Sequence, residues 1–160
     1  MPYALFHHAF PEVAAQETRT LTVLDSAFFH VPPGQYSLFE MYCDEPGCDC
    51  RRVMFSVVSS VQRDVGAVIA YGWESPRFYA KWLGADDPLM IDALRGPVLN
   101  VGSPQSALAP ALLDMMKKVV MRDQAYLERI KHHYAIFRER IEQSQARSRR
   151  RTQERKRRKT

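Results

Sequence analysis

Three cysteines are the residues of this 160-residue chain whose type and spacing favour a specific chemistry. Cys43, Cys48 and Cys50 hold all the thiols of the sequence and follow the pattern Cys-x4-Cys-x-Cys. Zn²⁺ is bound by cysteine sulfur at about 2.3 Å in a tetrahedral arrangement, and ligands that are close in sequence make such a site easier to assemble. The pattern therefore predicts a structural zinc site with these three residues as ligands, which we call the cysteine knuckle.

A fourth zinc ligand has to come from elsewhere. The candidates are residues of the loop, the N-terminal arm and the last helix: Asp44, Asp49, His7, His8, His132 and His133. His30 is a poor candidate, since a turn at residues 32–35 would place it about 20 Å from Cys43 at about 3.3 Å per strand residue. Two other interpretations stay open. The thiols are buried only for packing, as free cysteine often is, or two of them form a redox pair.

Apolar, strand-like runs on both sides of the knuckle make it the connection of a β-hairpin. Alternating patterns predict strands over residues 18–24, 27–31, 36–42, 51–61 and 65–73. Helix signals follow: Ser75-Pro76 with Gly84, Asp87-Pro88 with Gly96, a helix over 107–121, and a last helix capped by Asp123. Residues 1–15 form a small helix or a packed arm. The fold class is therefore α+β, with an N-terminal antiparallel sheet of four or five strands followed by C-terminal helices.

Composition fits one domain with an extension. The hydrophobic fraction of 46% is enough for a core, and residues 1–142 are expected to form it. No run of eighteen apolar residues and no secretion signal is legible, so we expect a cytoplasmic protein with reduced cysteines and no membrane span. Residues 143–160 contain no large hydrophobic side chain, so this basic tail is predicted to be disordered or to extend the last helix.

The positive charge of the chain is concentrated in that tail. Its basic residues are Arg147, Arg149, Arg150, Arg151, Arg155, Lys156, Arg157, Arg158 and Lys159. With Glu154 as the only acid, residues 147–160 carry 9 − 1 = +8, so the rest of the chain carries 5 − 8 = −3. Such a segment binds phosphates by releasing counterions, and arginine matches phosphate well. The absence of aromatic residues predicts nonspecific contact with an RNA or DNA backbone. A merely solubilising tail, or one that binds an acidic protein or lipid surface, stays open.

Three classes of function are compatible with these features. We favour a non-catalytic binding protein that contacts nucleic acid through its tail. The alternative is a protein–protein interaction module that presents the aromatic helix around Phe78 and Trp82. An enzyme would need an open metal position at the knuckle, with Glu45 or Asp49 as base. The sequence has no glycine-rich phosphate loop, Gly-x-Ser-x-Gly or His-Glu-x-x-His motif.

The knuckle with its preceding tyrosine, Tyr42-Cys43-x4-Cys48-x-Cys50, is followed by Arg51-Arg52-Val53. Together with the later segment His132-His133-Tyr134-Ala135-Ile136-Phe137, it resembles a family of uncharacterised bacterial proteins. The resemblance covers about half of the chain. It implies a bacterial cytoplasmic protein and no particular activity.

Overall fold

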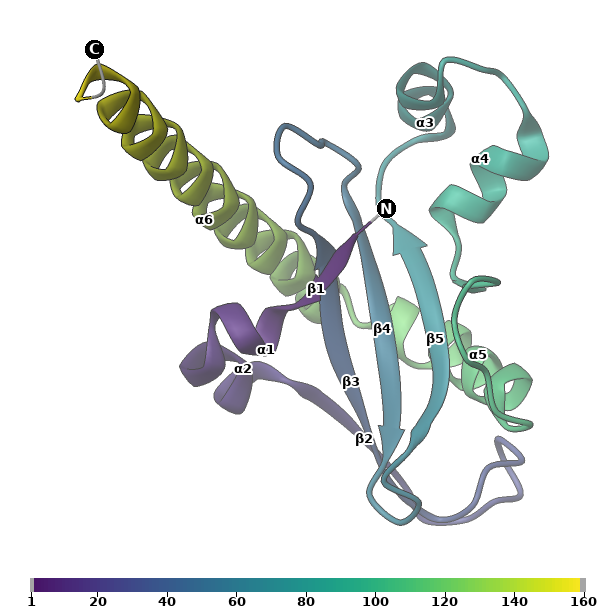
Figure 1. Cartoon of the computed structure of the whole chain (residues 1–160). Coiled ribbons are helices and arrows are strands. Elements are labelled where there is room, and N and C mark those ends of the chain that lie inside the picture. Colours follow the sequence, from purple (N-terminus) through teal and green to yellow (C-terminus); the bar gives the residue numbers. More distant parts are fainter. Residues whose placement is uncertain (1, 159–160) are drawn as a thin grey trace.

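The alternating apolar segments pair into a six-stranded antiparallel sheet, seen in the computed structural model of residues 2–158 (Figure 1). The strand order is β1-β3-β4-β5-β6, and β2 also pairs with β3. Both β1 and β2 pair with β3, with Tyr3 opposite Cys43 and Arg19 opposite Leu38. The strands are β1 (Tyr3–Leu5), β2 (Arg19–Val23), β3 (Gly34–Cys43), β4 (Arg52–Ser59), β5 (Val65–Gly72) and β6 (Val98–Leu99).

Four of the five predicted strands are confirmed as β2, β3, β4 and β5, and the strand predicted at 27–31 is wrong. That segment is a turn, because the Asp25 carboxylate accepts a hydrogen bond from the Ala27 N–H at 2.9 Å and His30 has a positive φ of 55°. Two strands were not predicted. β1 and β6 have three and two residues, which is too short for an alternating pattern to be recognised.

The helices begin at the capping residues that the sequence indicates. Ser75 accepts from the Phe78 N–H at 3.2 Å, Asp87 from the Leu89 N–H at 3.0 Å and Asp123 from the Tyr126 N–H at 3.1 Å. The N-terminal arm forms two short helices. The helices are α1 (Phe6–Ala9), α2 (Pro11–Glu17), α3 (Pro76–Leu83), α4 (Pro88–Arg95), α5 (Ala109–Lys118) and α6 (Gln124–Arg157).

One hydrophobic core joins the sheet to the first half of α6. The side chains of Tyr36, Leu38 and Tyr42 on one face of β3 are buried, as are Tyr126 and Ile130 of α6. Because residues i, i+2 and i+4 of a strand share a face, the alternation in β3 directs these three side chains into the same core. The helix is thereby fixed against the sheet before it reaches the knuckle.

The second half of α6 leaves the body as a projecting rod (Figure 1). Its 34 residues span about 51 Å at about 1.5 Å per residue. The tail is therefore not disordered from residue 143: the alternative prediction, an extension of the last helix, holds as far as Arg157. The reason is composition, because residues 124–158 contain no Gly or Pro and many strong helix formers. None of the helices in the described part of the chain has the length and apolar character needed to cross a bilayer.

Candidate metal centre and basic helix

The connection between β3 and β4 brings the three predicted metal ligands together. The Sγ atoms of Cys43, Cys48 and Cys50 all lie within 4.8 Å of one another, and no disulfide joins them. Cys43 and Cys50 are buried, whereas Cys48 is partly exposed. The loop is closed by a 3.2 Å hydrogen bond from the Cys48 N–H to the Glu45 carbonyl oxygen. Gly47 has a φ of 74°, a conformation that glycine adopts without strain.

This donor set fits a thiophilic cation. Zn–S bonds of about 2.3 Å place the sulfurs of a tetrahedral site about 3.8 Å apart, a separation that the knuckle meets with small adjustments. Burial, with a smaller contribution from neighbouring thiols, raises the pKa of both Cys43 and Cys50. A bound cation would supply the charge that favours the thiolates. Beside them the Tyr3 hydroxyl is buried, and its pKa is raised by burial and then by the neighbouring Cys50 thiol.

The structure does not supply the predicted fourth ligand. Within residues 2–158 the cluster contains only the three cysteines, and none of the six candidates joins it: Asp44, Asp49, His7, His8, His132 and His133. The Asp49 carboxylate instead pairs with the Arg51 guanidinium at 2.9 Å. His30 lies in the connection that precedes β3, at the opposite end of that strand from Cys43. Among the described residues the site therefore has three protein ligands, and its fourth donor is not assigned.

Helix α6 holds the knuckle from outside. The Arg138 guanidinium donates hydrogen bonds of 2.9 Å to the carbonyl oxygens of both Cys43 and Glu45. One turn later the Glu142 carboxylate accepts from the Gly47 N–H at 2.9 Å and from Arg138 at 2.7 Å. The knuckle and residues 138–142 of α6 are thus one hydrogen-bonded unit, and the basic part of the helix begins directly after it.

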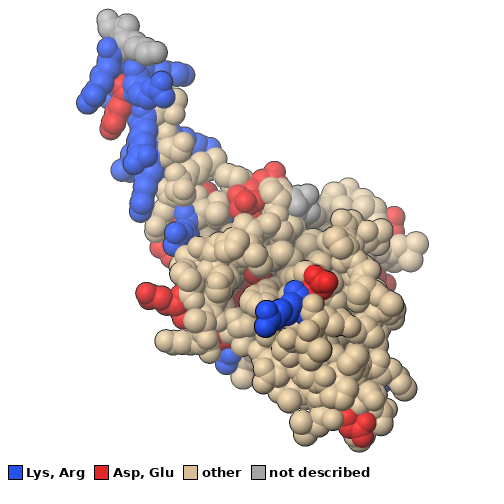
Figure 2. Space-filling view, turned by 60° about the horizontal axis from the view of Figure 1, so that its bottom comes forward, with Lys and Arg blue, Asp and Glu red and all other residues tan. Residues whose placement is uncertain are grey.

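The basic residues predicted to bind nucleic acid lie on the projecting part of α6. Figure 2 shows Lys and Arg crowded along this arm, while the face of the body in view carries few charges. The eight basic residues from Arg147 to Arg158 are exposed, and with Glu154 they give 8 − 1 = +7. Lys159, the ninth predicted residue, lies outside the described residues. Where this arm leaves the body, a polar hollow of about 330 Å³ is lined by Arg140, Gln143, Ser144 and Arg147.

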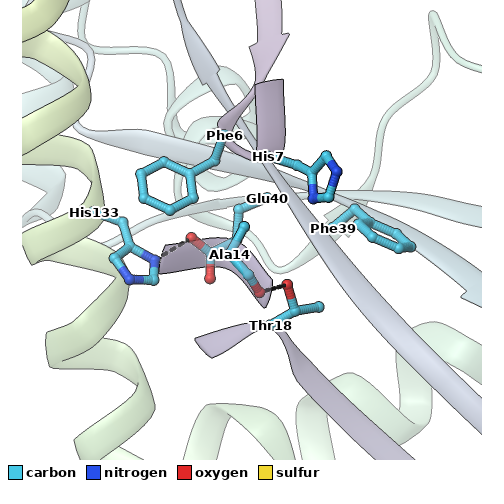
Figure 3. Close-up of a pocket in the computed structure, with 7 residues that line it drawn as sticks. All are labelled: Phe6, His7, Ala14, Thr18, Phe39, Glu40 and His133. Carbon is cyan, nitrogen blue, oxygen red and sulfur yellow. Dashed lines mark hydrogen bonds and ion pairs between the residues drawn. The ribbon is translucent and has the colours of Figure 1, made fainter. Parts of the chain in front are cut away.

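A buried ionic network that sequence reasoning missed lies under the α1–α2 arm (Figure 3). The two ring nitrogens of His133 contact carboxylates, Nδ1 with Glu40 at 2.7 Å and Nε2 with Glu17 at 2.6 Å. The hydroxyls of Tyr42 and Tyr126 donate to Glu40 at 2.6 and 3.1 Å. His133, one of the six candidate zinc ligands, is instead a packed residue whose two ring nitrogens contact carboxylates. One feature of the sequence could have indicated this network: Glu40 is a carboxylate on an otherwise apolar face of its strand, where a buried charge needs a partner.

The inner side of this network is buried. The side chains of His133 and Glu40 are 1% and 4% exposed, against 40% for Glu17. Burial alone would lower the pKa of His133, but the hydrogen bonds and charges of Glu40 and Glu17 outweigh it and raise that pKa. The hydrogen bond from His133 in turn lowers the pKa of Glu17. The arrangement ties α2, β3 and α6 together through the His133 imidazole, and the raised pKa favours its protonated form.

The aromatic helix α3 is turned toward the body. Tyr79 is fully buried and its hydroxyl donates to the Arg51 carbonyl oxygen at 2.8 Å. The Arg51 guanidinium lies 4.7 Å from the ring centre of Phe78, and Trp82 packs against the core. The aromatic side chains of α3 therefore mainly hold Arg51, the residue directly after the knuckle, and contribute less to an exposed surface.

The chain was compared with known protein families, curated proteins and solved structures. No family model, curated protein or solved structure matches the chain.

Proposed function

We propose that this is a non-catalytic nucleic-acid-binding protein whose contact element is the basic part of α6 and whose cysteine knuckle holds a structural Zn²⁺. The proposal rests on the direct hydrogen-bond contact between the cysteine knuckle and α6. Arg138 and Glu142 of α6 hydrogen-bond to the knuckle, and the +7 segment begins five residues after Glu142. A metal-stiffened loop at the base of an otherwise unsupported helix would fix the direction in which the helix leaves the body.

The character of the projecting segment favours a polyanion over the other partners. From residue 143 onward it has no large apolar side chain, so it lacks the hydrophobic face by which amphipathic helices enter a membrane interface. Its charge is nearly all of one sign and exposed, which suits counterion release from a phosphate backbone. The body carries the opposite net charge, −3, so the helix is the part that would make the contact.

Zinc has a structural role in this proposal. Cys43, Cys48 and Cys50 would hold the ion, and water or another donor would complete the tetrahedron. The candidate base of a catalytic site, Asp49, is ion-paired with Arg51, and Glu45 is exposed, which favours the structural role. A reducing compartment would keep the three free thiols available for metal, which supports a cytoplasmic location.

Fluorescence anisotropy with labelled nucleic acid tests the proposal. We expect the full chain to bind at about 50 mM salt and to weaken with a log–log salt slope of about −4 to −7, as expected for several phosphate contacts. Four helix arginines are changed to Gln in one variant: Arg147, Arg151, Arg155 and Arg158. The matched control loses four exposed charges from the body: Arg63, Arg77, Lys81 and Lys117.

The helix variant and the control variant each lose four positive charges, the first from α6 and the second from the body. The proposal predicts that the helix variant loses most of its affinity and that the control retains it. If both variants weaken equally, net charge and not the helix determines binding. If the unmodified chain does not bind DNA or RNA at low salt, the proposed function is wrong.

A further inference from the structure

The basic and neutral residues of the projecting segment are not distributed evenly around α6. At about 100° per residue, Arg147, Arg151, Arg155 and Arg158 fall within a sector of about 80°, which we call the first row. Arg149 and Lys156 form a second row, about 150° away around the axis from the centre of the first row. Between the two rows lies a neutral stripe of three residues: Gln145, Ser148 and Thr152. Opposite the stripe are the only acid, Glu154, and a back pair, Arg150 and Arg157.

From this pattern we infer that the partner is double-stranded B-form DNA and that α6 lies in its major groove. The inference rests on the proposed function and specifies its ligand. A groove has two phosphate walls with base edges between them. A helix that fits it needs cations on two sides and short neutral hydrogen-bonding side chains in the middle. Gln, Ser and Thr are residue types that read base edges, whereas Arg and Lys contact the walls.

The dimensions agree with this ligand. The major groove of B-DNA is about 12 Å wide and about 8.5 Å deep, which admits a helix of about 10–12 Å diameter. Residues 143–158 extend about 22 Å, the length of about six base pairs. This part of α6 projects beyond the sheet, which leaves it accessible to a duplex (Figure 1). The A-form RNA duplex is a poorer fit, since its major groove is deep and narrow.

The hollow at the base of the arm extends the first row toward the body. Arg140 and Arg147 lie on this side of α6, and Gln143 and Ser144 complete the polar lining of about 330 Å³. Arg140 is held in place, because its guanidinium donates to the Ala9 carbonyl oxygen at 2.7 Å and lies 5.3 Å from the Phe10 ring centre. A backbone phosphate in this hollow would set how far the helix enters the groove.

The test compares charge-matched variants of the full, zinc-loaded chain on two probes, a mixed-sequence DNA duplex and an RNA duplex of the same sequence. The groove pair Arg149→Gln with Arg151→Gln removes one cation from each side of the neutral stripe. The back pair Arg150→Gln with Arg157→Gln removes two cations that face away. A third variant, Thr152→Pro, breaks the helix without changing charge, with Thr152→Ala as its control. These positions are exposed and outside the core, so folding of the body is unaffected.

Groove binding predicts DNA affinity at least about tenfold above RNA affinity. It predicts a loss of about tenfold for the groove pair and for Thr152→Pro, with less than about threefold for the back pair. Equal losses for the two arginine pairs, or RNA bound as tightly as DNA, would overturn the groove inference and leave nucleic-acid binding standing. Failure of the unmodified chain to bind either probe would overturn both. Circular dichroism shows whether Thr152→Pro has broken the helix.

Discussion

Arg138 of helix α6 donates a 2.9 Å hydrogen bond to the carbonyl oxygen of Cys43, 95 residues earlier in the chain. The same guanidinium reaches Glu45, so a single side chain spans the entrance of the knuckle. The cysteine loop is therefore attached to the helix that carries the basic residues. Changes at either element are expected to affect the other.

Replacing Arg138 by Ala tests this attachment. The side chain is 12% exposed, and its loss leaves two carbonyl oxygens without a charged donor. We expect a loss of about 2 kcal/mol in the free energy of unfolding, measured by urea denaturation. Lys131→Ala is the control, because its ion pair with Glu128 is exposed and is worth at most about 0.5 kcal/mol. Equal stability of the two variants would show that the attachment contributes little.

The buried carboxylate of Glu40 is expected to be a large contributor to stability. Glu40→Gln removes the charge that faces His133 in a site 4% exposed, so we expect a loss of about 3 kcal/mol. Glu17→Gln removes the other partner of the same imidazole, but Glu17 is 40% exposed and solvent screens it, so a loss of about 1 kcal/mol or less follows. The measurement is again denaturant unfolding at neutral pH. The opposite ranking would contradict the central place of Glu40.

The pH dependence of stability should report on His133. Its folded pKa is raised above 6.5, so the stabilisation from the protonated ring is complete below about pH 6.5 and is lost as pH rises through the folded value. Glu17 has a lowered pKa, so its contribution is present above about pH 4.5 and is lost as pH falls through its folded value.

We therefore expect the stability difference between the unmodified chain and His133→Gln to be largest between about pH 5 and pH 6.5 and to shrink toward about pH 9. Glu40 and Glu17 are the titratable groups that contact the ring, and the hydroxyls of Tyr42 and Tyr126 donate to Glu40. The measurement is the free energy of unfolding of both proteins across this pH series. A difference that stays constant from pH 5 to 9 would mean that the ring does not titrate in the folded state.

Metal content provides a separate prediction. Protein purified without added metal is expected to contain one zinc per chain, measured by elemental mass spectrometry. Cys48→Ser is expected to lose the zinc and lower the melting temperature by several degrees, since about 1 kcal/mol shifts it by about 2–4 °C in a chain of this size. Cys48 is the most accessible of the three cysteines, so its replacement opens no cavity in the core. Asp49→Asn is the control in the same loop and should retain the metal. If the unmodified chain contains no metal, the proposed zinc site is wrong.

Local signals were sufficient to predict most of the fold. The helix caps at Ser75, Asp87 and Asp123 and the alternation in β3 act within a few residues, so they can be recognised in the sequence. The three-thiol cluster was predictable for the same reason. The contacts of His133 with Glu40 and Glu17 join residues 93 and 116 positions apart, and no local pattern specifies such pairs.

The tail shows a different limit of sequence reasoning. The apolar stripe of α6 ends at Ile141, which correctly indicates that packing against the body ends there. It does not indicate that the helix ends, because propensity alone continues it to Arg157. The fourth metal ligand expected from the sequence was not found among the described residues. The candidate histidines were chosen by residue type, and their positions are set by the tertiary packing of α1 and α6.

Whether the knuckle and the basic helix act together is tested by the affinity of the full chain for a DNA duplex at fixed low salt, measured before and after a chelator removes the metal. If the zinc-bound knuckle fixes the base of α6, affinity should fall by about threefold to tenfold without metal and return when zinc is added back. Affinity that does not change on metal removal, or no binding in either state, would contradict the claim that the knuckle and the basic helix work as one nucleic-acid-binding unit.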